Sequence, residues 1–94
     1  MKKGDRLFVR IDHRIPENKF EPNDFEGHVK YLQGVAAERF FVGGGFVNSL
    51  GGMILFKAKD FEEAKEICDN DPLILKSLYT YDLHEWDLVI VSDK

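Results

Sequence analysis

The sequence predicts an α+β domain of the ferredoxin-like class, in which a four-stranded antiparallel sheet carries two helices on one face. Four segments are apolar and rich in β-branched or aromatic residues, as strands are. Two further segments repeat apolar residues at every third or fourth position, as amphipathic helices do. These segments follow one another as β-α-β-β-α-β. Right-handed crossovers in both strand-helix-strand halves place the two helices on the same side of one sheet, a ferredoxin-like sandwich.

Composition limits the size and class of this protein. The chain has 94 residues, 13 Lys and Arg against 17 Asp and Glu, and an apolar fraction of 44%, as in globular domains. This length predicts a single domain over residues 1–94. No apolar run reaches the roughly 20 residues of a membrane helix, and no basic stripe suited to nucleic acid is present. We expect a cytoplasmic protein, because the first residues lack the apolar stretch of a signal peptide.

The first quarter of the chain predicts a strand, a loop and the start of a helix. Residues 5–12 are apolar with polar ends, which is typical of a strand. Residues 13–23 are polar and contain two prolines, which predicts a loop. The first helix is expected over residues 24–38, with Asn23 or Asp24 as its N-cap. His28 lies on its apolar stripe, which consists of Phe25, Val29, Leu32 and Ala36.

A hairpin with a glycine run follows. Residues 39–47 predict the second strand, residues 48–51 a turn and residues 53–56 the third strand. The second strand is interrupted by Gly43, Gly44 and Gly45, where we expect a β-bulge or a close backbone approach. A phosphate loop is disfavoured, because no Lys-Ser/Thr pair is present and no helix follows. These glycines could still leave space for a ligand beside His28 and expose their amides to an anion.

The second half predicts a helix and a long strand. Asp60 and Glu63 form a capping-box-like start for the second helix, which should end at Asp71 because Pro72 disfavours helix at the preceding residue. A short turn over residues 73–77 then leads to a last strand over residues 78–91. The inward stripe of the second helix, continued by Asp71, consists of Phe61, Ala64, Ile67 and Cys68.

The strand sequences also predict what covers the sheet. Residues 7–9, 53–56 and 88–91 are apolar at successive positions, so both faces of the sheet should be apolar. A bare second face would exceed the ~300–600 Å² that the largest apolar patch of a monomer usually covers. We therefore expect a homodimer that packs sheet to sheet.

His28 and Asp71 are the candidate catalytic residues, and each has a structural alternative. Histidine is the residue type that gains and loses protons near neutral pH, which suits a general acid or base. The alternative is a core histidine that is hydrogen-bonded to the backbone. Asp71 could orient the imidazole from the neighbouring helix, or could simply cap the turn that begins at Pro72.

The remaining polar candidates carry weaker signals. Arg10 and Arg14 could meet an anionic substrate at the mouth of a pocket, although solvation at the surface is the simpler role. His13 and His84 form no closely spaced histidine pair, so we expect no metal site. Cys68 is the single cysteine and is interpreted as a small core residue, which also excludes an intrachain disulfide.

Taken together, these segments resemble the YciI-like (YCII-related) family within the dimeric α+β barrel group. The resemblance is carried by residues 27–32, 43–46, 60–64 and 69–72, and by Trp86. It implies a ferredoxin-like fold, a homodimer formed through the sheets, and a His/Asp active site that maps onto His28 and Asp71. The sequence departs from the family pattern at Phe46, where Gly-Pro is common, and in its highly charged loop over residues 13–23.

The leading functional interpretation is a small homodimeric enzyme in which His28 is the general acid or base and Asp71 orients it. The reaction would be an isomerisation, a lyase-type (dehalogenase) elimination or a hydrolysis on a small anionic organic molecule, without a cofactor or metal. The alternative is a non-catalytic small-molecule-binding or accessory domain on the same dimeric scaffold.

Overall fold

The computed structural model describes residues 1–94 and contains four strands and three helices. The strands form one sheet in the order β2-β3-β1-β4, and all neighbouring strands are antiparallel. The predicted α+β, ferredoxin-like arrangement is confirmed. In chain order the elements are β1 (Arg6–Arg14), α1 (Asp24–Ala36), β2 (Phe41–Gly45), β3 (Gly52–Phe56), α2 (Phe61–Asp69), α3 (Pro72–Leu75) and β4 (Tyr79–Asp87).

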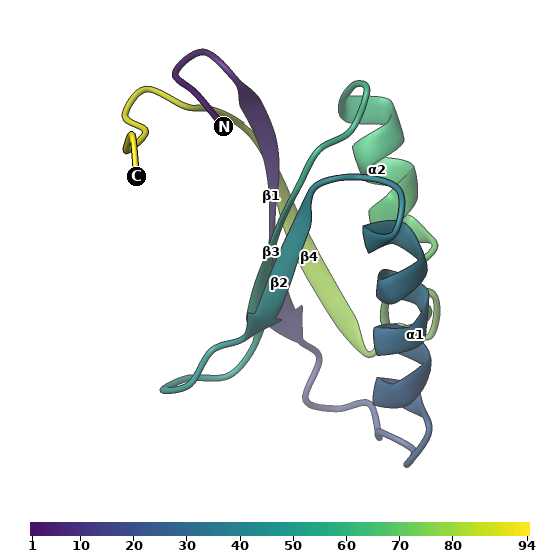
Figure 1. The fold of residues 1–94 in the computed structure, drawn as a ribbon. Coiled ribbons are helices and arrows are strands. Elements are labelled where there is room, and N and C mark those ends of the chain that lie inside the picture. The colour runs from purple at the N-terminus through teal and green to yellow at the C-terminus, as the bar shows by residue number, and fades with distance from the viewer.

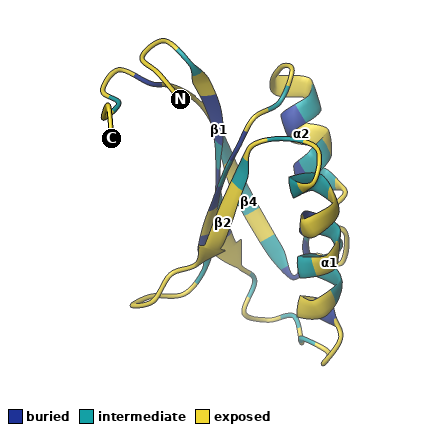
Figure 2. Ribbon diagram, viewed as in Figure 1, coloured by how far each residue is buried: buried dark blue, intermediate teal, exposed yellow.

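Two layers make up the molecule. The helices α1 and α2 lie on one face of the sheet, and the opposite face carries no element of this chain (Figure 1). The core lies between the layers and consists of Phe8, Leu32, Ile54, Phe56, Ala64 and Cys68. The outward sides of the helices and most of β2 are exposed (Figure 2). None of the helices has the length and apolar character needed to cross a membrane.

The outer strands differ from the predicted bounds at both ends. β1 continues through His13 and Arg14, which were expected in a loop, because its ladder with β4 extends to the pair Arg14↔Tyr79. β4 stops at Asp87, although the last strand was expected to reach residue 91. Asp87 pairs with the first residue of β1, so the chain beyond it has no strand left to pair with.

The predicted interruption of the second strand is wrong. β2 runs continuously from Phe41 to Gly45 and pairs residue for residue with β3, so there is no bulge. The close backbone approach does occur. A Cβ added at Gly43 would lie 2.9 Å from Cγ1 of Ile54, and one added at Gly52 would lie 2.5 Å from the carbonyl oxygen of Gly44.

The predicted N-cap makes a capping hydrogen bond in α2 but not in α1. Asp60 caps α2 as predicted, because its Oδ1 accepts a hydrogen bond of 2.8 Å from the backbone N–H of Glu63. Asn23 occupies the cap position of α1, but its side chain makes no capping hydrogen bond. Both helices end two residues earlier than expected, α1 at Ala36 and α2 at Asp69.

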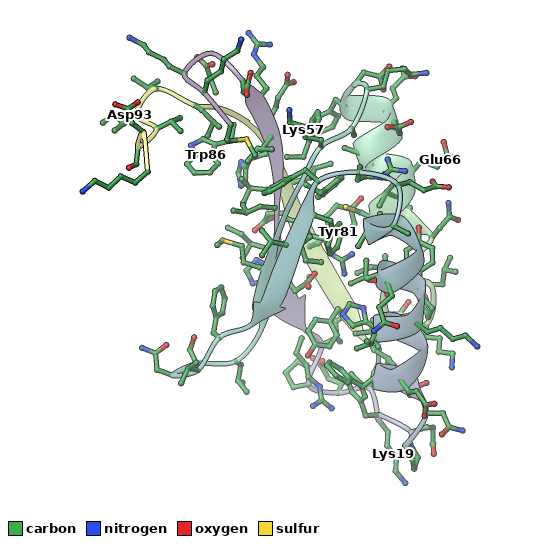
Figure 3. The ribbon with its side chains drawn as sticks, viewed as in Figure 1. Lys19, Lys57, Glu66, Tyr81, Trp86 and Asp93 are labelled. Carbon is green, nitrogen blue, oxygen red and sulfur yellow. The ribbon has the colours of Figure 1, made fainter.

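The face of the sheet turned away from the helices is rich in apolar side chains. Alternation along β1 places Phe8 and Arg10 towards the helices and Val9 and Ile11 on the opposite side. Figure 3 shows Tyr81 between the sheet and the helices, whereas Trp86 of the same strand projects from the far face. We call this far side the open face. Its apolar residues are Val9, Ile11, Val42, Met53, Leu55 and Trp86, and the register also places Asp82 and His84 on it.

Candidate active site

His28 of α1 and Asp71, which lies between α2 and α3, are in direct contact. Nδ1 of His28 lies 2.9 Å from Oδ1 and 2.8 Å from Oδ2 of Asp71. A carboxylate can only accept hydrogen bonds, so the ring nitrogen must carry the hydrogen and donate it. In the neutral ring, Nε2 then carries no hydrogen and is the nitrogen that can accept a proton.

Asp71 is completely buried and stays ionised because of its neighbours. Besides His28, it accepts a hydrogen bond of 3.0 Å from the backbone N–H of Leu73 and pairs at 2.9 Å with Nη1 of Arg10. Burial disfavours the charged carboxylate, but the hydrogen bond from His28 and the charge of Arg10 outweigh it and hold the pKa of Asp71 below its ordinary value. The ionised Asp71 holds the ring of His28 in one orientation through this contact.

Asp71 makes the contacts that both sequence interpretations require. Asp71 is the N-cap of α3, with Pro72 in the first turn. The same carboxylate also receives the hydrogen of His28. Because α2 ends at Asp69, Asp71 is extended rather than helical, and this backbone lets one side chain reach both its own α3 and the neighbouring α1.

Arg10 is not at the mouth of a pocket. It is 1% exposed, its Nε lies 2.7 Å from Oδ1 of Asp12, and its Nη1 pairs with Asp71. The reason is the period of the strand, which turns Arg10 to the same side as Phe8, beneath the helices. Arg14 lies at the exposed end of β1, where its guanidinium carbon is 4.5 Å from the ring centroid of Phe20. Neither arginine lines the cavity.

Sequence reasoning missed Asp12. This aspartate is buried on β1 two residues after Arg10, on the same side of the sheet. Burial raises the pKa of Asp12, while the neighbouring Arg10 opposes that rise. A signal was present in the sequence: Arg10 and Asp12 share the strand face of the core residue Phe8, and charges at such positions need partners.

A cavity of about 460 Å³ opens beside His28, between α1 and the β2–β3 hairpin. Its size falls in the range of small-molecule sites. The wall is mostly apolar, with Phe25, Val29, Leu32 and Ile54 among its residues. Its polar side chains are those of Asp12, His28, Gln33 and Tyr79.

The structure brings the glycine run to this cavity. Gly43, Gly44 and Gly45 line it together with Gly51 and Gly52, opposite the α1 residues that include His28. That these glycines leave space for a ligand, and that their amides bind an anion, are still predictions from the sequence.

The other candidates lie outside this cavity. Nε2 of His13 lies 2.8 Å from Oδ2 of Asp82 at the surface, and His84 is exposed. No three His, Cys, Asp or Glu side chains are grouped so that they could hold a metal ion. Cys68 is buried in the core, and burial raises the pKa of its thiol to about 11, so it stays protonated at neutral pH.

Comparison with known proteins finds similarity to a domain family, a curated relative and a solved structure. The YCII-related domain family matches residues 8–87. The uncharacterized protein YjpA of Bacillus subtilis (strain 168) is 34% identical over 71 residues, which cover 74% of this chain and 84% of that protein. The solved structure is 5-chloro-2-hydroxyhydroquinone dehydrochlorinase (TftG) from Burkholderia phenoliruptrix AC1100 in complex with 2,5-dihydroxybenzoquinone. It matches with a TM-score of 0.67 and 18% identity, covering 86% of this chain and 93% of that one. At that identity the likeness shows a shared fold.

Proposed function

This chain belongs to the YCII-related domain family, as its motifs predicted, and we propose that it is a small enzyme whose His28–Asp71 pair transfers protons. The observation that carries the proposal is the contact of Nδ1 of His28 with both oxygens of a buried carboxylate, at the wall of a small-molecule-sized cavity. An imidazole held by a charged partner beside a cavity is the arrangement that general acid–base catalysis requires.

The proposed chemistry follows from where the hydrogens lie. Asp71 holds the hydrogen on Nδ1, so Nε2 is free to take a proton from a C–H or O–H group of the substrate. The electron pair of the broken bond stays on the substrate, and the imidazolium that forms is stabilised by Asp71. Returning the proton to another atom gives isomerisation, whereas loss of a leaving group gives elimination. A base positioned in this way contributes ~10²–10⁴-fold to the rate.

The solved relative supports the lyase variant of this chemistry. TftG is a dehydrochlorinase by name, and removal of HCl from a carbon compound needs a group that accepts a proton. Among the reaction types expected from the sequence, elimination on a small organic molecule is therefore the one that we favour for this chain.

A non-catalytic binding domain is the second candidate, and one observation favours it. Asp71 also pairs with Arg10 and caps α3, so its contact with His28 belongs to a network that stabilises the fold by itself. In this alternative the cavity binds a small molecule, and His28 is only one of its hydrogen-bonding groups.

We also propose that the working unit is a homodimer. The open face exposes Val42, Met53 and Trp86 on a sheet whose other face is covered by helices. A second copy packed against it would bury these side chains and convert two open sheets into a closed barrel. The cavity lies on the helix side, so each protomer keeps its own.

Hydrogen exchange with solvent tests the enzymatic proposal even though the natural substrate is unidentified. The protein is incubated in D₂O with a panel of small carbon acids, including 2,5-dihydroxybenzoquinone and enol lactones, and loss of C–H signals is followed by ¹H NMR. We expect the wild type to accelerate exchange in at least one compound. His28→Gln should remove ~10²–10⁴-fold of that rate while the circular dichroism spectrum stays unchanged.

Lys30→Gln is the control, because Lys30 is exposed on the same helix as His28 and does not line the cavity. Its exchange rate should equal that of the wild type. Exchange that survives in His28→Gln contradicts the proposal. A panel compound that binds without any exchange supports the non-catalytic alternative instead.

A further inference from the structure

A second carboxylate faces the cavity, and the proposed function leaves it unused. The side chain of Asp12 is 8% exposed and forms part of the cavity wall. Its Oδ1 accepts the hydrogen bond from Nε of Arg10, but Oδ2 accepts none from the protein. Nη2 of Arg10 is the one fully buried side-chain nitrogen or oxygen that has no hydrogen-bond partner. Oδ2 of Asp12 also has no partner but is not among the fully buried atoms, so part of its surface is accessible. Asp12 is thus nearly buried, yet its free oxygen stands where a ligand can reach it.

The charges around this oxygen decide what it can bind. Arg10 has Nε on Asp12 and Nη1 on Asp71, so its positive charge is already balanced by carboxylates. The ionisable side chains of the cavity wall are Asp12, His28 and Tyr79. Even with His28 protonated, two carboxylates offset the two cations of this cluster. An anionic ligand therefore meets no net positive charge, and the lone pairs of Oδ2 repel it.

A hydroxyl group is the natural partner for Oδ2. A hydrogen bond from a neutral donor to a charged acceptor is stronger than one between two neutral groups, because one partner is ionised. His28 and Asp12 both line this cavity. One small molecule can therefore reach both groups while its apolar part rests against Phe25, Leu32 and Ile54.

We propose that Oδ2 of Asp12 accepts a hydrogen bond from a ligand hydroxyl, and that the cavity takes neutral, hydroxyl-bearing organic molecules rather than anions. The proposal replaces the anionic substrate expected from the sequence, which depended on Arg10 and Arg14 at the cavity mouth. It rests on the proposed function only in taking this cavity as the ligand site. His28 need not be catalytic for it to hold.

Three probes of similar size test the proposal near neutral pH by NMR titration of backbone amides. Resorcinol is neutral and donates hydrogen bonds, anisole is neutral and donates none, and benzoate is an anion. We expect resorcinol to bind the wild type about tenfold more tightly than either of the others. This comparison needs no variant. Equal or tighter binding of benzoate, or no saturable binding of resorcinol, overturns the proposal.

Substitution then assigns the preference to Asp12. In Asp12→Asn the negative charge is gone, so benzoate should bind about tenfold more tightly than it binds the wild type. Glu66→Gln is the control, because Glu66 is an exposed carboxylate on the outer side of α2 and does not line the cavity. It should leave all three affinities unchanged. An unaltered resorcinol-to-benzoate ratio in folded Asp12→Asn contradicts the role of Asp12.

The outcome is separable from that of the enzymatic proposal. His28→Gln should keep the preference for resorcinol over benzoate, since the preference depends on Asp12. Loss of hydrogen exchange with the preference intact therefore concerns His28 alone. A benzoate preference in a protein that still catalyses exchange overturns the present inference and leaves the enzymatic one standing.

Discussion

Asp71 receives donors from three separate elements: His28 on α1, Arg10 on β1 and the backbone of Leu73 on α3. The carboxylate that would orient the imidazole is therefore also a point at which the sheet and two helices are joined. Substituting Asp71 disturbs stability and chemistry together. His28 can be replaced with less damage, because its ring contributes only one of these contacts.

Arg10→Met tests how strongly the buried cluster stabilises the protein. Removing the guanidinium leaves Asp12 and Asp71 without their shared partner, and breaking a buried ion pair in this way costs about 3–5 kcal/mol of the free energy of unfolding. Urea denaturation measures the loss. Arg6→Met is the control, because Arg6 is 64% exposed and its 3.2 Å pair with Glu85 is worth at most about 1 kcal/mol. Similar losses of unfolding free energy in both variants would contradict the proposed contribution of the Arg10, Asp12 and Asp71 cluster to stability.

At the scale of elements, the β2–β3 hairpin forms one wall of the cavity. β2 holds its ladder despite three consecutive glycines, because each of them pairs with a residue of β3. Close packing accounts for Gly43, where an added Cβ would lie 2.9 Å from Ile54. Gly51, in the turn between the two strands, is favoured for two reasons: its φ is +91°, and an added Cβ would lie 2.5 Å from the backbone oxygen of Asp12.

Alanine substitutions in this hairpin should separate packed glycines from free ones. Gly52→Ala forces a Cβ to within 2.5 Å of the carbonyl oxygen of Gly44, and relieving this overlap should cost about 1–3 kcal/mol. In Gly44→Ala the Cβ meets nothing within 4 Å, so stability should change by less than about 0.5 kcal/mol. Thermal unfolding compares the two variants. Equal stability would show that the hairpin shifts to accept either side chain.

At the scale of the whole molecule, the two faces of the sheet have different surroundings. One face is covered by α1 and α2, and the core and the cavity lie there. The other face exposes apolar side chains from all four strands, among them Ile11, Val42, Met53 and Trp86. An apolar sheet face of this extent is typical of a surface that another protein covers.

Met53→Lys should dissociate the proposed homodimer. Met53 lies on β3 in the open face, and a lysine placed there would bring an unpaired charge into an apolar interface. We expect the dissociation constant to rise at least about 100-fold, which corresponds to about 2.7 kcal/mol. Analytical ultracentrifugation of a dilution series measures it. Leu75→Lys is the control, since Leu75 is 66% exposed on α3 and should leave the dimer intact. A monomeric wild type at high concentration would contradict the proposal.

The sequence by itself determined the α+β class, the order of the elements and the family, because periodicity, capping residues and turn residues are local signals. It also singled out His28, which lies on the apolar stripe of α1, and Asp71, which was expected to continue the stripe of the second helix. The pairing of strands was not readable in this way. Where β1 ends depends on β4, which is distant in the chain, and the continuity of β2 through its glycines depends on its ladder with β3.

Only the tertiary structure decided the surroundings of Arg10 and Asp12. The sequence of a strand does not tell whether a charged residue faces the core or the solvent. That depends on which face of the strand the helices cover. The fold turns both side chains inward, pairs Arg10 with two carboxylates and leaves one oxygen of Asp12 at the cavity. Burial is a property of the assembled layers, so the change from an expected anion site to a site for hydroxyl-bearing molecules could only come from the three-dimensional arrangement.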